Sequence, residues 1–342
     1  MNRTSSTFLT LSCLTSVSLA ISLLAQGPPP MRQHTANKAQ PLKLLPASEN
    51  PPAEHHESIQ KQGESRVVVS NAIPGHLVGV FPNRANPHTI EEQKYHFVLP
   101  ADPKPAAETT PTHNSSPTGP PNRPFGIALN GVLFDPGTAE FWNADREADW
   151  NYEALGGALR LGLDENHAHV QPSGAYHYHG ISKLYLRAIG AGRDKHSPLV
   201  GWAADGFPIY ALYGSKDPQD PRSPIVEMTS SYQLKKGQRP SGEDGPGGEY
   251  DGAFSRDYEY VENSGTLDEC NGRFCITPDF PEGTYAYFLT GEWPVVPRHF
   301  RGTPVELRPA GGGGERGGKG GKGKGGKGGK GKGEKGIGAP PR

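Results

Sequence analysis

Short alternations of apolar and polar residues recur along the middle of the chain, and they predict β-strands. The clearest examples are RVVVSN at 66–71, YHFVL at 95–99 and TYAYFLT at 284–290. Successive side chains of a strand point to opposite faces, so each segment would turn one face to a core. Asn130-Gly131 and Asp205-Gly206 interrupt two further apolar stretches, 125–134 and 199–213, and predict hairpin turns.

A helical pattern is weak by comparison. Only residues 139–161 have an apolar and aromatic spacing that suits a helix, and Gly156-Gly157 interrupts it. Frequent short strands separated by Gly and Pro therefore predict a mainly β fold with little helix. We expect a single compact domain of short antiparallel strands and hairpins at 66–309, flanked by disordered termini.

The N-terminal residues have a different composition from the predicted domain. Residues 1–25 contain Arg3 followed by a run rich in Leu, Ser, Thr and Ala, which is typical of a signal peptide, and Cys13 would leave with it. The alternative is an uncleaved N-terminal anchor. We expect an exported protein in the periplasm, on the cell surface or secreted, with 26–65 as a disordered spacer rich in Pro and Gln.

The C-terminal residues 310–342 consist almost wholly of Gly and Lys. Seven Lys and two Arg stand against two Glu in this tail, which has a formal charge of +7. No core can form from such a composition, so we expect a flexible polycation. Its partners would be anionic envelope polymers or a membrane surface, or it only keeps the protein in solution. Because no aromatic residues separate its lysines, specific nucleic-acid binding is not expected.

Residues 167–180, HAHVQPSGAYHYHG, contain two H-x-H pairs on either side of a turn. Pro172-Ser173-Gly174 suits a three-residue hairpin loop in which Gly174 takes the left-handed conformation. This register would oppose the two pairs and turn Tyr176 and Tyr178 to the other face. All four imidazoles would then form one patch, made by His167, His169, His177 and His179.

Neutral imidazole binds zinc and copper, so the four histidines predict a transition-metal site. Asp164 is the first candidate for an additional ligand. The remaining candidates for supporting or alternative roles are Glu165, Tyr176, Tyr178, Asp205, Asp268 and Glu269. The alternative is a ladder of polar aromatic side chains that binds no metal.

Two cysteines remain once the leader is removed. Cys270 and Cys275 lie in DECNGRFC, and an exported protein would join them in a short-loop disulfide. Free or metal-binding thiols are the alternative. No G-x-S-x-G, H-E-x-x-H, Walker A or G-x-G-x-x-G motif lies in a fitting context, which argues against a serine hydrolase, a zincin, an NTPase and a dinucleotide-binding protein.

The tetrapeptide Tyr176 to His179 resembles the motif of the YHYH domain family. The similarity extends over most of the predicted domain, through the segments 70–83, 86–93, 126–136, 164–180, 199–214 and 267–290. The resemblance implies an exported protein without an established activity, and it marks His177 and His179 most firmly. Members often have a histidine where this chain has Ala286, which implies weaker metal binding here if that histidine is a ligand elsewhere.

Three functions follow from these patterns. The first is an exported protein that binds copper or zinc through the histidine patch. Four histidines would saturate a tetrahedral ion, whereas three and a water would permit hydrolysis or oxidation. The second is a surface or adhesion module that binds envelope polysaccharide without metal. The third is a metal-free hydrolase that pairs a histidine with Asp164 or Asp205 as acid and base.

Overall fold

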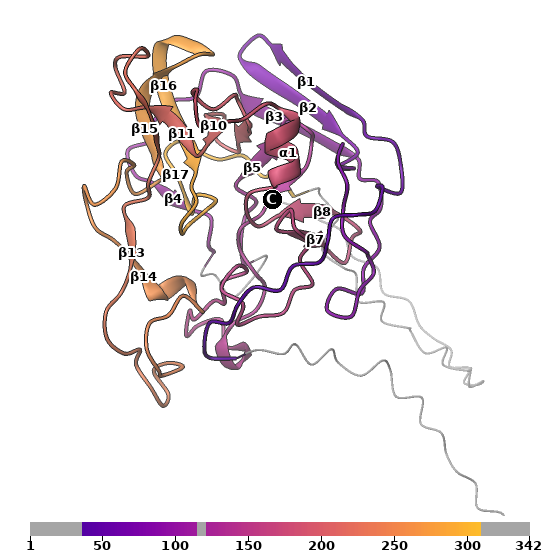
Figure 1. Ribbon diagram of the computed structural model, residues 1–342, viewed down its shortest axis with the longest axis vertical. Coiled ribbons are helices and arrows are strands. Elements are labelled where there is room, and N and C mark those ends of the chain that lie inside the picture. Colours follow the sequence, from indigo (N-terminus) through magenta and orange to yellow (C-terminus); the bar gives the residue numbers. More distant parts are fainter. Residues whose placement is uncertain (1–35, 115–120, 309–342) are drawn as a thin grey trace, which may run out of the picture.

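The computed structural model describes residues 36–114 and 121–308 (Figure 1). Most of its regular structure is strand, which confirms the mainly β fold. A three-stranded antiparallel sheet has the order β1-β2-β3. Its strands are β1 (Glu57–Gln62), β2 (Ser65–Ser70) and β3 (Tyr95–Pro100). Buried and exposed residues alternate strictly along β3, as its sequence predicts.

An eight-stranded mixed sheet forms the centre of the molecule, in the order β15-β16-β10-β9-β5-β6-β8-β7. Two of its pairs, β6–β8 and β10–β16, are parallel and the others are antiparallel, so the sheet is mixed. Its strands are β5 (Gly126–Ala128), β6 (Leu133–Phe134), β7 (Ala168–Val170), β8 (Tyr176–Tyr178), β9 (Gly201–Ala203), β10 (Pro208–Ala211), β15 (Gly272–Thr277) and β16 (Phe280–Leu289).

The remaining strands form three short antiparallel pairs at the periphery. They are β11 (Tyr213–Ser215) with β12 (Ile225–Glu227), β13 (Tyr232–Leu234) with β14 (Tyr258–Tyr260), and β4 (Thr110–Pro111) with β17 (His299–Phe300). Two 3-10 turns lie at Trp142–Ala144 and Ser255–Asp257.

Both expected hairpins with Gly turns are present. Strands β5 and β6 pair around Gly131, and β9 and β10 pair around Gly206. Both glycines have positive φ, the conformation for which the turns need Gly. Every residue of β5, β9 and β10 is buried, because both faces of this part of the sheet are covered.

Residues 139–161, the one stretch whose spacing suits a helix, form no α-helix and contain only the 3-10 turn at Trp142–Ala144. Three residues of this stretch, Asn143, Ala144 and Asp149, have positive φ, which a continuous helix does not allow. The α-helix in the described part of the chain is α1 (Lys183–Ala188). Ser182 caps its N-terminus by accepting a hydrogen bond from the Tyr185 backbone N–H at 3.1 Å.

The segment expected to be a disordered spacer is bound to the domain from residue 36 onward. Strand β1 lies within it, and Leu45 forms a β-bridge with Asp164. The Arg239 guanidinium donates a hydrogen bond to the Asn37 carbonyl at 2.9 Å. An irregular segment with no apolar period is held here by backbone hydrogen bonds and by Leu42 and Leu44, which pack on an apolar cluster, and the sequence pattern does not reveal either.

The main core lies between the two sheets. Phe97 and Leu99 of β3 join the same apolar cluster as Phe134, Tyr178 and many residues of the eight-stranded sheet. Among the described residues, no helix is long and apolar enough to cross a membrane. The expected signal segment at 1–25 and cationic tail at 310–342 lie outside the described residues.

Candidate metal centre

The hairpin β7–β8 has the predicted register. His169 lies directly opposite His177, and the Gln171 N–H donates to the Ala175 carbonyl at 2.9 Å. Gly174 has a φ of +82° in the loop, as expected for a left-handed position. The opposite face is also as predicted, because Tyr176 and Tyr178 are fully buried in the main core.

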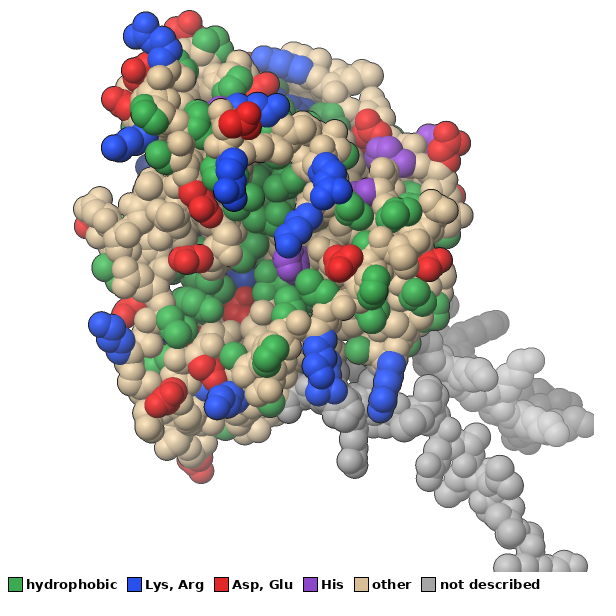
Figure 2. Space-filling view, in the orientation of Figure 1, with side chains coloured by type: hydrophobic (Ala, Val, Ile, Leu, Met, Phe, Trp, Pro, Cys, Tyr) green, Lys and Arg blue, Asp and Glu red, His purple; other side chains and the backbone are tan. Residues whose placement is uncertain are grey.

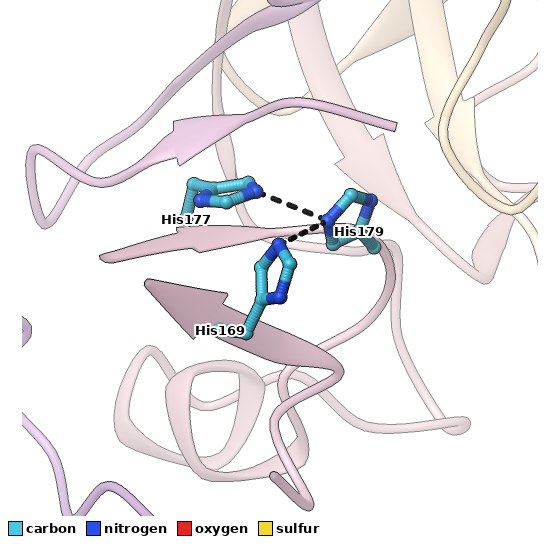
Figure 3. Close-up of side chains that lie close together, drawn as sticks. All are labelled: His169, His177 and His179. Carbon is cyan, nitrogen blue, oxygen red and sulfur yellow. Dashed lines mark hydrogen bonds between the residues drawn. The ribbon is translucent and has the colours of Figure 1, made fainter. Parts of the chain in front are cut away.

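Three histidines from this hairpin converge on one point (Figure 3). The Nε2 atom of His179 lies 3.0 Å from that of His177 and 3.1 Å from that of His169. Three nitrogens bound to a tetrahedral ion at 2.0–2.1 Å lie about 3.3 Å apart, and both of these distances are within a few tenths of an ångström of that value. We call His169, His177 and His179 the histidine triad.

The second nitrogen of each triad imidazole lies against a backbone carbonyl. His169 Nδ1 is 2.9 Å from the Leu161 oxygen, and the corresponding partners of His177 and His179 are Ala175 at 3.3 Å and Pro136 at 3.4 Å. A carbonyl only accepts, so these contacts favour the tautomer with the proton on Nδ1 and the lone pair on Nε2. In that tautomer three lone pairs face one another, an arrangement that a cation stabilises.

Protonation of the triad is disfavoured. Burial lowers the pKa of His169 to about 3 and that of His177 to about 4, and in His169 the nearby His177 lowers it further. Burial, followed by the two neighbouring imidazoles, holds the pKa of His179 well below its ordinary value. At neutral pH the triad is uncharged and offers the form of imidazole that binds metals.

His167 does not join the triad, so the expected patch of four imidazoles is wrong. Its φ is +53°, and β7 begins only at the next residue, so the strand alternation does not reach it. Its Nδ1 lies 2.9 Å from the Ile181 carbonyl, and its ring lines a separate cleft. The backbone of His167 still pairs as predicted, since its carbonyl accepts the His179 N–H at 2.8 Å.

Asp164 is fully buried in a network on the tyrosine side of the hairpin. Its carboxylate accepts hydrogen bonds from the backbone N–H groups of Gly79 and Asn166, both at 2.9 Å, and from the Tyr176 hydroxyl at 2.7 Å. The Tyr178 hydroxyl contacts His76 Nε2 at 2.6 Å. The contacts of Asp164 are those of a structural carboxylate.

The other carboxylates proposed for the site lie in separate networks. Glu165 accepts the Ala47 N–H at 3.2 Å, and Asp205 accepts the Tyr287 hydroxyl at 2.5 Å in the β9–β10 turn. Asp268 accepts the Tyr285 hydroxyl at 2.9 Å, and the Glu269 carbonyl accepts the Tyr232 hydroxyl at 2.9 Å. Within residues 36–114 and 121–308, none of these carboxylates forms a hydrogen bond with a triad imidazole.

Cys270 and Cys275 are both buried free thiols, so the expected disulfide is absent. They belong to different apolar clusters, with Cys270 in the main core and Cys275 beside Tyr210 and Phe288. Burial raises the pKa of both thiols, which opposes their reaction.

Ala286, where the family resemblance implied that a ligand histidine is missing, is far from the triad. It lies on β16, and four strands separate β16 from β8 in the sheet. Ala286 is fully buried in the same cluster as Cys275. An alanine at position 286 therefore does not deprive the triad of a ligand.

Asp135 is a residue near the triad that the local sequence pattern did not identify. It follows β6, which pairs in parallel with β8, so this register places Asp135 on the histidine face beside His179. Its carboxylate accepts hydrogen bonds from Gln171 Nε2 at 3.0 Å and Arg308 Nη2 at 3.1 Å, and its Oδ1 is buried without a partner among the described residues.

The fold and the triad define a mainly β protein with a buried cluster of three histidines on one hairpin. The family model described as YHYH protein matches residues 83–302. The chain belongs to the YHYH protein family. No curated protein and no solved structure matches the chain.

Proposed function

We propose that this protein binds one zinc or copper ion through the Nε2 atoms of the histidine triad. The observation that carries the proposal is the convergence of three Nε2 atoms on rings whose Nδ1 atoms lie against backbone carbonyls. Backbone carbonyls that fix the tautomer and orientation of an imidazole are a common feature around metal ligands. Imidazole alone suits zinc and copper better than magnesium or calcium.

Three protein ligands would leave one position of a tetrahedral ion open. A metal that has such a position can polarise a bound water or a substrate oxygen, whereas four protein ligands favour a structural role. His177 and His179 are almost fully buried and His169 is only partly so. An exchangeable ligand would therefore approach past His169.

We further propose that the protein acts outside the cytoplasm. The support for this is the composition of residues 1–25, which is typical of an export signal. The metal that the protein binds there would be set by the ligands of the triad and by which metals are available outside the cell.

The deciding experiment measures bound metal in the full chain, purified without a histidine tag. The native protein is equilibrated with zinc or copper, desalted and analysed by mass spectrometry. We expect about one ion per chain. The triple variant His169→Asn, His177→Asn and His179→Asn should hold none while keeping the native circular dichroism spectrum.

The variant His167→Asn is the matched control, because His167 lies in the same hairpin but outside the triad. It should bind as much metal as the native protein. Native protein that retains neither metal would overturn the proposal, and so would a folded triple variant that retains its metal.

A further inference from the structure

A second candidate site lies away from the triad nitrogens. A cleft of about 660 Å³ lies between α1, the β10–β11 connection and the loop that follows β16. On the face shown in Figure 2, a central hollow of hydrophobic side chains is bordered by Lys and Arg and contains a histidine. The apolar lining includes Leu155, Ile181, Leu186, Leu212 and Val295. Both the volume and the composition are those of a small-molecule site.

Two polar atoms at this cleft are buried without a hydrogen-bond partner among the described residues: Glu153 Oε1 and Trp293 Nε1. Glu153 is only 3% exposed, and its other oxygen accepts a hydrogen bond from Arg298 Nη2 at 2.7 Å, which fixes the carboxylate. Leaving such a group unsatisfied costs about 1–3 kcal/mol. A ligand hydroxyl can donate to the carboxylate oxygen, and a ligand oxygen can accept the indole N–H.

Two cations border the same cleft. Lys183 and Arg187 are one turn apart on α1, so they lie on one face of the helix. Both are exposed, and neither has an ion pair within residues 36–114 and 121–308. Two like charges at this spacing repel each other, and an anionic group between them would remove that cost.

The walls of the cleft include strained backbone. His167, Leu212 and Val295 all line it, and their φ values are +53°, +63° and +59°. A left-handed conformation costs about 1–2 kcal/mol for a residue with a Cβ, and most for a β-branched one such as Val295. Strain of this kind concentrates at ligand sites, where the surrounding structure holds it.

We propose that this cleft binds a small organic acid with an apolar or aromatic body and a hydroxyl group. The body occupies the apolar lining, the anionic group lies between Lys183 and Arg187, and the hydroxyl donates to Glu153 Oε1. The site does not depend on metal binding, because none of the triad histidines lines the cleft.

Calorimetry with three related probes tests each part of the proposal. The probe 6-hydroxy-2-naphthoate has the aromatic body, the anion and the hydroxyl, whereas 2-naphthoate lacks the hydroxyl and 2-naphthol lacks the anion. We expect one molecule of hydroxynaphthoate per chain, with tighter binding than either analogue. The double variant Lys183→Gln and Arg187→Gln should weaken it roughly tenfold or more and leave naphthol nearly unchanged.

The matched control is Lys61→Gln with Lys94→Gln, which removes two exposed cations outside the cleft lining. This variant should bind all three probes as the native protein does.

Glu153→Gln should remove the advantage of hydroxynaphthoate over naphthoate. Trp293→Phe removes the indole N–H and keeps an aromatic ring against Tyr258. It should weaken the binding of hydroxynaphthoate while the ion pair between Glu153 and Arg298 stays intact. Absence of saturable binding of any probe would overturn the proposal, as would equal binding by the double variant.

Discussion

The Nε2 atoms of His177 and His179 lie 3.0 Å apart, within hydrogen-bond distance of each other (Figure 3). The Nδ1 atom of each ring lies close to a backbone carbonyl, that of Ala175 for His177 and that of Pro136 for His179. When each Nδ1 holds the proton, these two Nε2 acceptors face each other in a buried site and repel, and His169 adds a third. A cation between the nitrogens removes this repulsion, which supports the metal site that we propose.

Asp135 should strengthen metal binding in its ionised form, which the ion pair with Arg308 favours although burial raises the pKa of this carboxyl. Asp135 lies on the histidine face, and its carboxylate acts electrostatically on His169. We expect Asp135→Asn to weaken zinc binding by about ten- to a hundredfold, the range for groups that support metal ligands. Competition with a chromogenic chelator measures this affinity.

Asp268→Asn is the matched control for Asp135. Asp268 is a carboxylate that also accepts side-chain and backbone hydrogen bonds, but it precedes β15 at the far edge of the sheet. This substitution should leave the zinc affinity unchanged. Equal affinities of the Asp135 variant and the native protein would show that the charge does not reach the triad.

Gly174 should control both stability and metal affinity. A Cβ at this position would lie 2.5 Å from the Glu91 Cβ, in addition to the strain at a φ of +82°. We expect Gly174→Ala to displace the loop that holds β7 against β8 and to weaken zinc binding along with the free energy of unfolding. Gly63→Ala is the control, because Gly63 has a φ of +62° and open space around it.

The two glycine variants separate backbone strain from displacement of the hairpin. Gly63→Ala should cost about 1 kcal/mol in urea unfolding and leave the zinc affinity unchanged. If Gly174→Ala also left the affinity unchanged, the loop conformation would not position the triad.

The sequence predicted the parts of the site that depend on local rules. The side-chain period of two placed His177 on the face opposite Tyr176, and the chemistry of Pro172 and Gly174 set the register. His167 departed from the strand pattern because Asp164 begins a turn just before β7. In this turn the His167 N–H donates a hydrogen bond to the Asp164 carbonyl at 2.9 Å. Asp164 and Asn166 are residue types that favour turns, so the sequence did contain a signal that the strand begins after His167.

The remainder of the site depends on contacts between distant segments. Asp135 reaches the histidine face through the parallel pairing of β6 with β8, and no local pattern specifies that pairing. Arg308 then approaches Asp135 from the end of the described chain. The absence of an α-helix at 139–161 has a similar cause, because the aromatic residues Trp150 and Tyr152 pack on Phe254 rather than along one helix face.

Asp164 should contribute to stability and not to metal binding. An amide at this position would direct an N–H toward groups that now donate, the Gly79 N–H or the Tyr176 hydroxyl. We expect Asp164→Asn to lower the free energy of unfolding by about 1–3 kcal/mol and to leave one metal ion per chain. Glu165→Gln, at the exposed neighbouring residue, should change neither quantity. Loss of metal from a folded Asp164 variant would show that this carboxylate is a ligand after all.

His196 should make the protein less stable in mild acid. Its Nδ1 lies 2.8 Å from the Ser197 carbonyl, and its Nε2 is buried without a partner among the described residues. Burial lowers the pKa of His196 below its ordinary value, so the unfolded chain binds a proton more readily than the folded one. The stabilisation by neutral His196 is complete above about pH 6.5 and is lost as the pH falls toward the folded pKa.

His196→Phe removes this titration and keeps a ring against Tyr210, which His196 meets edge-on at 5.0 Å. Urea unfolding of both proteins at about pH 7.5 and pH 5 isolates the effect, since the other histidines titrate in both and cancel. The native protein should lose stability relative to the variant by up to about 1.4 kcal/mol per pH unit below pH 6.5. A difference that stays constant across this range would mean that His196 keeps its ordinary pKa in the folded protein.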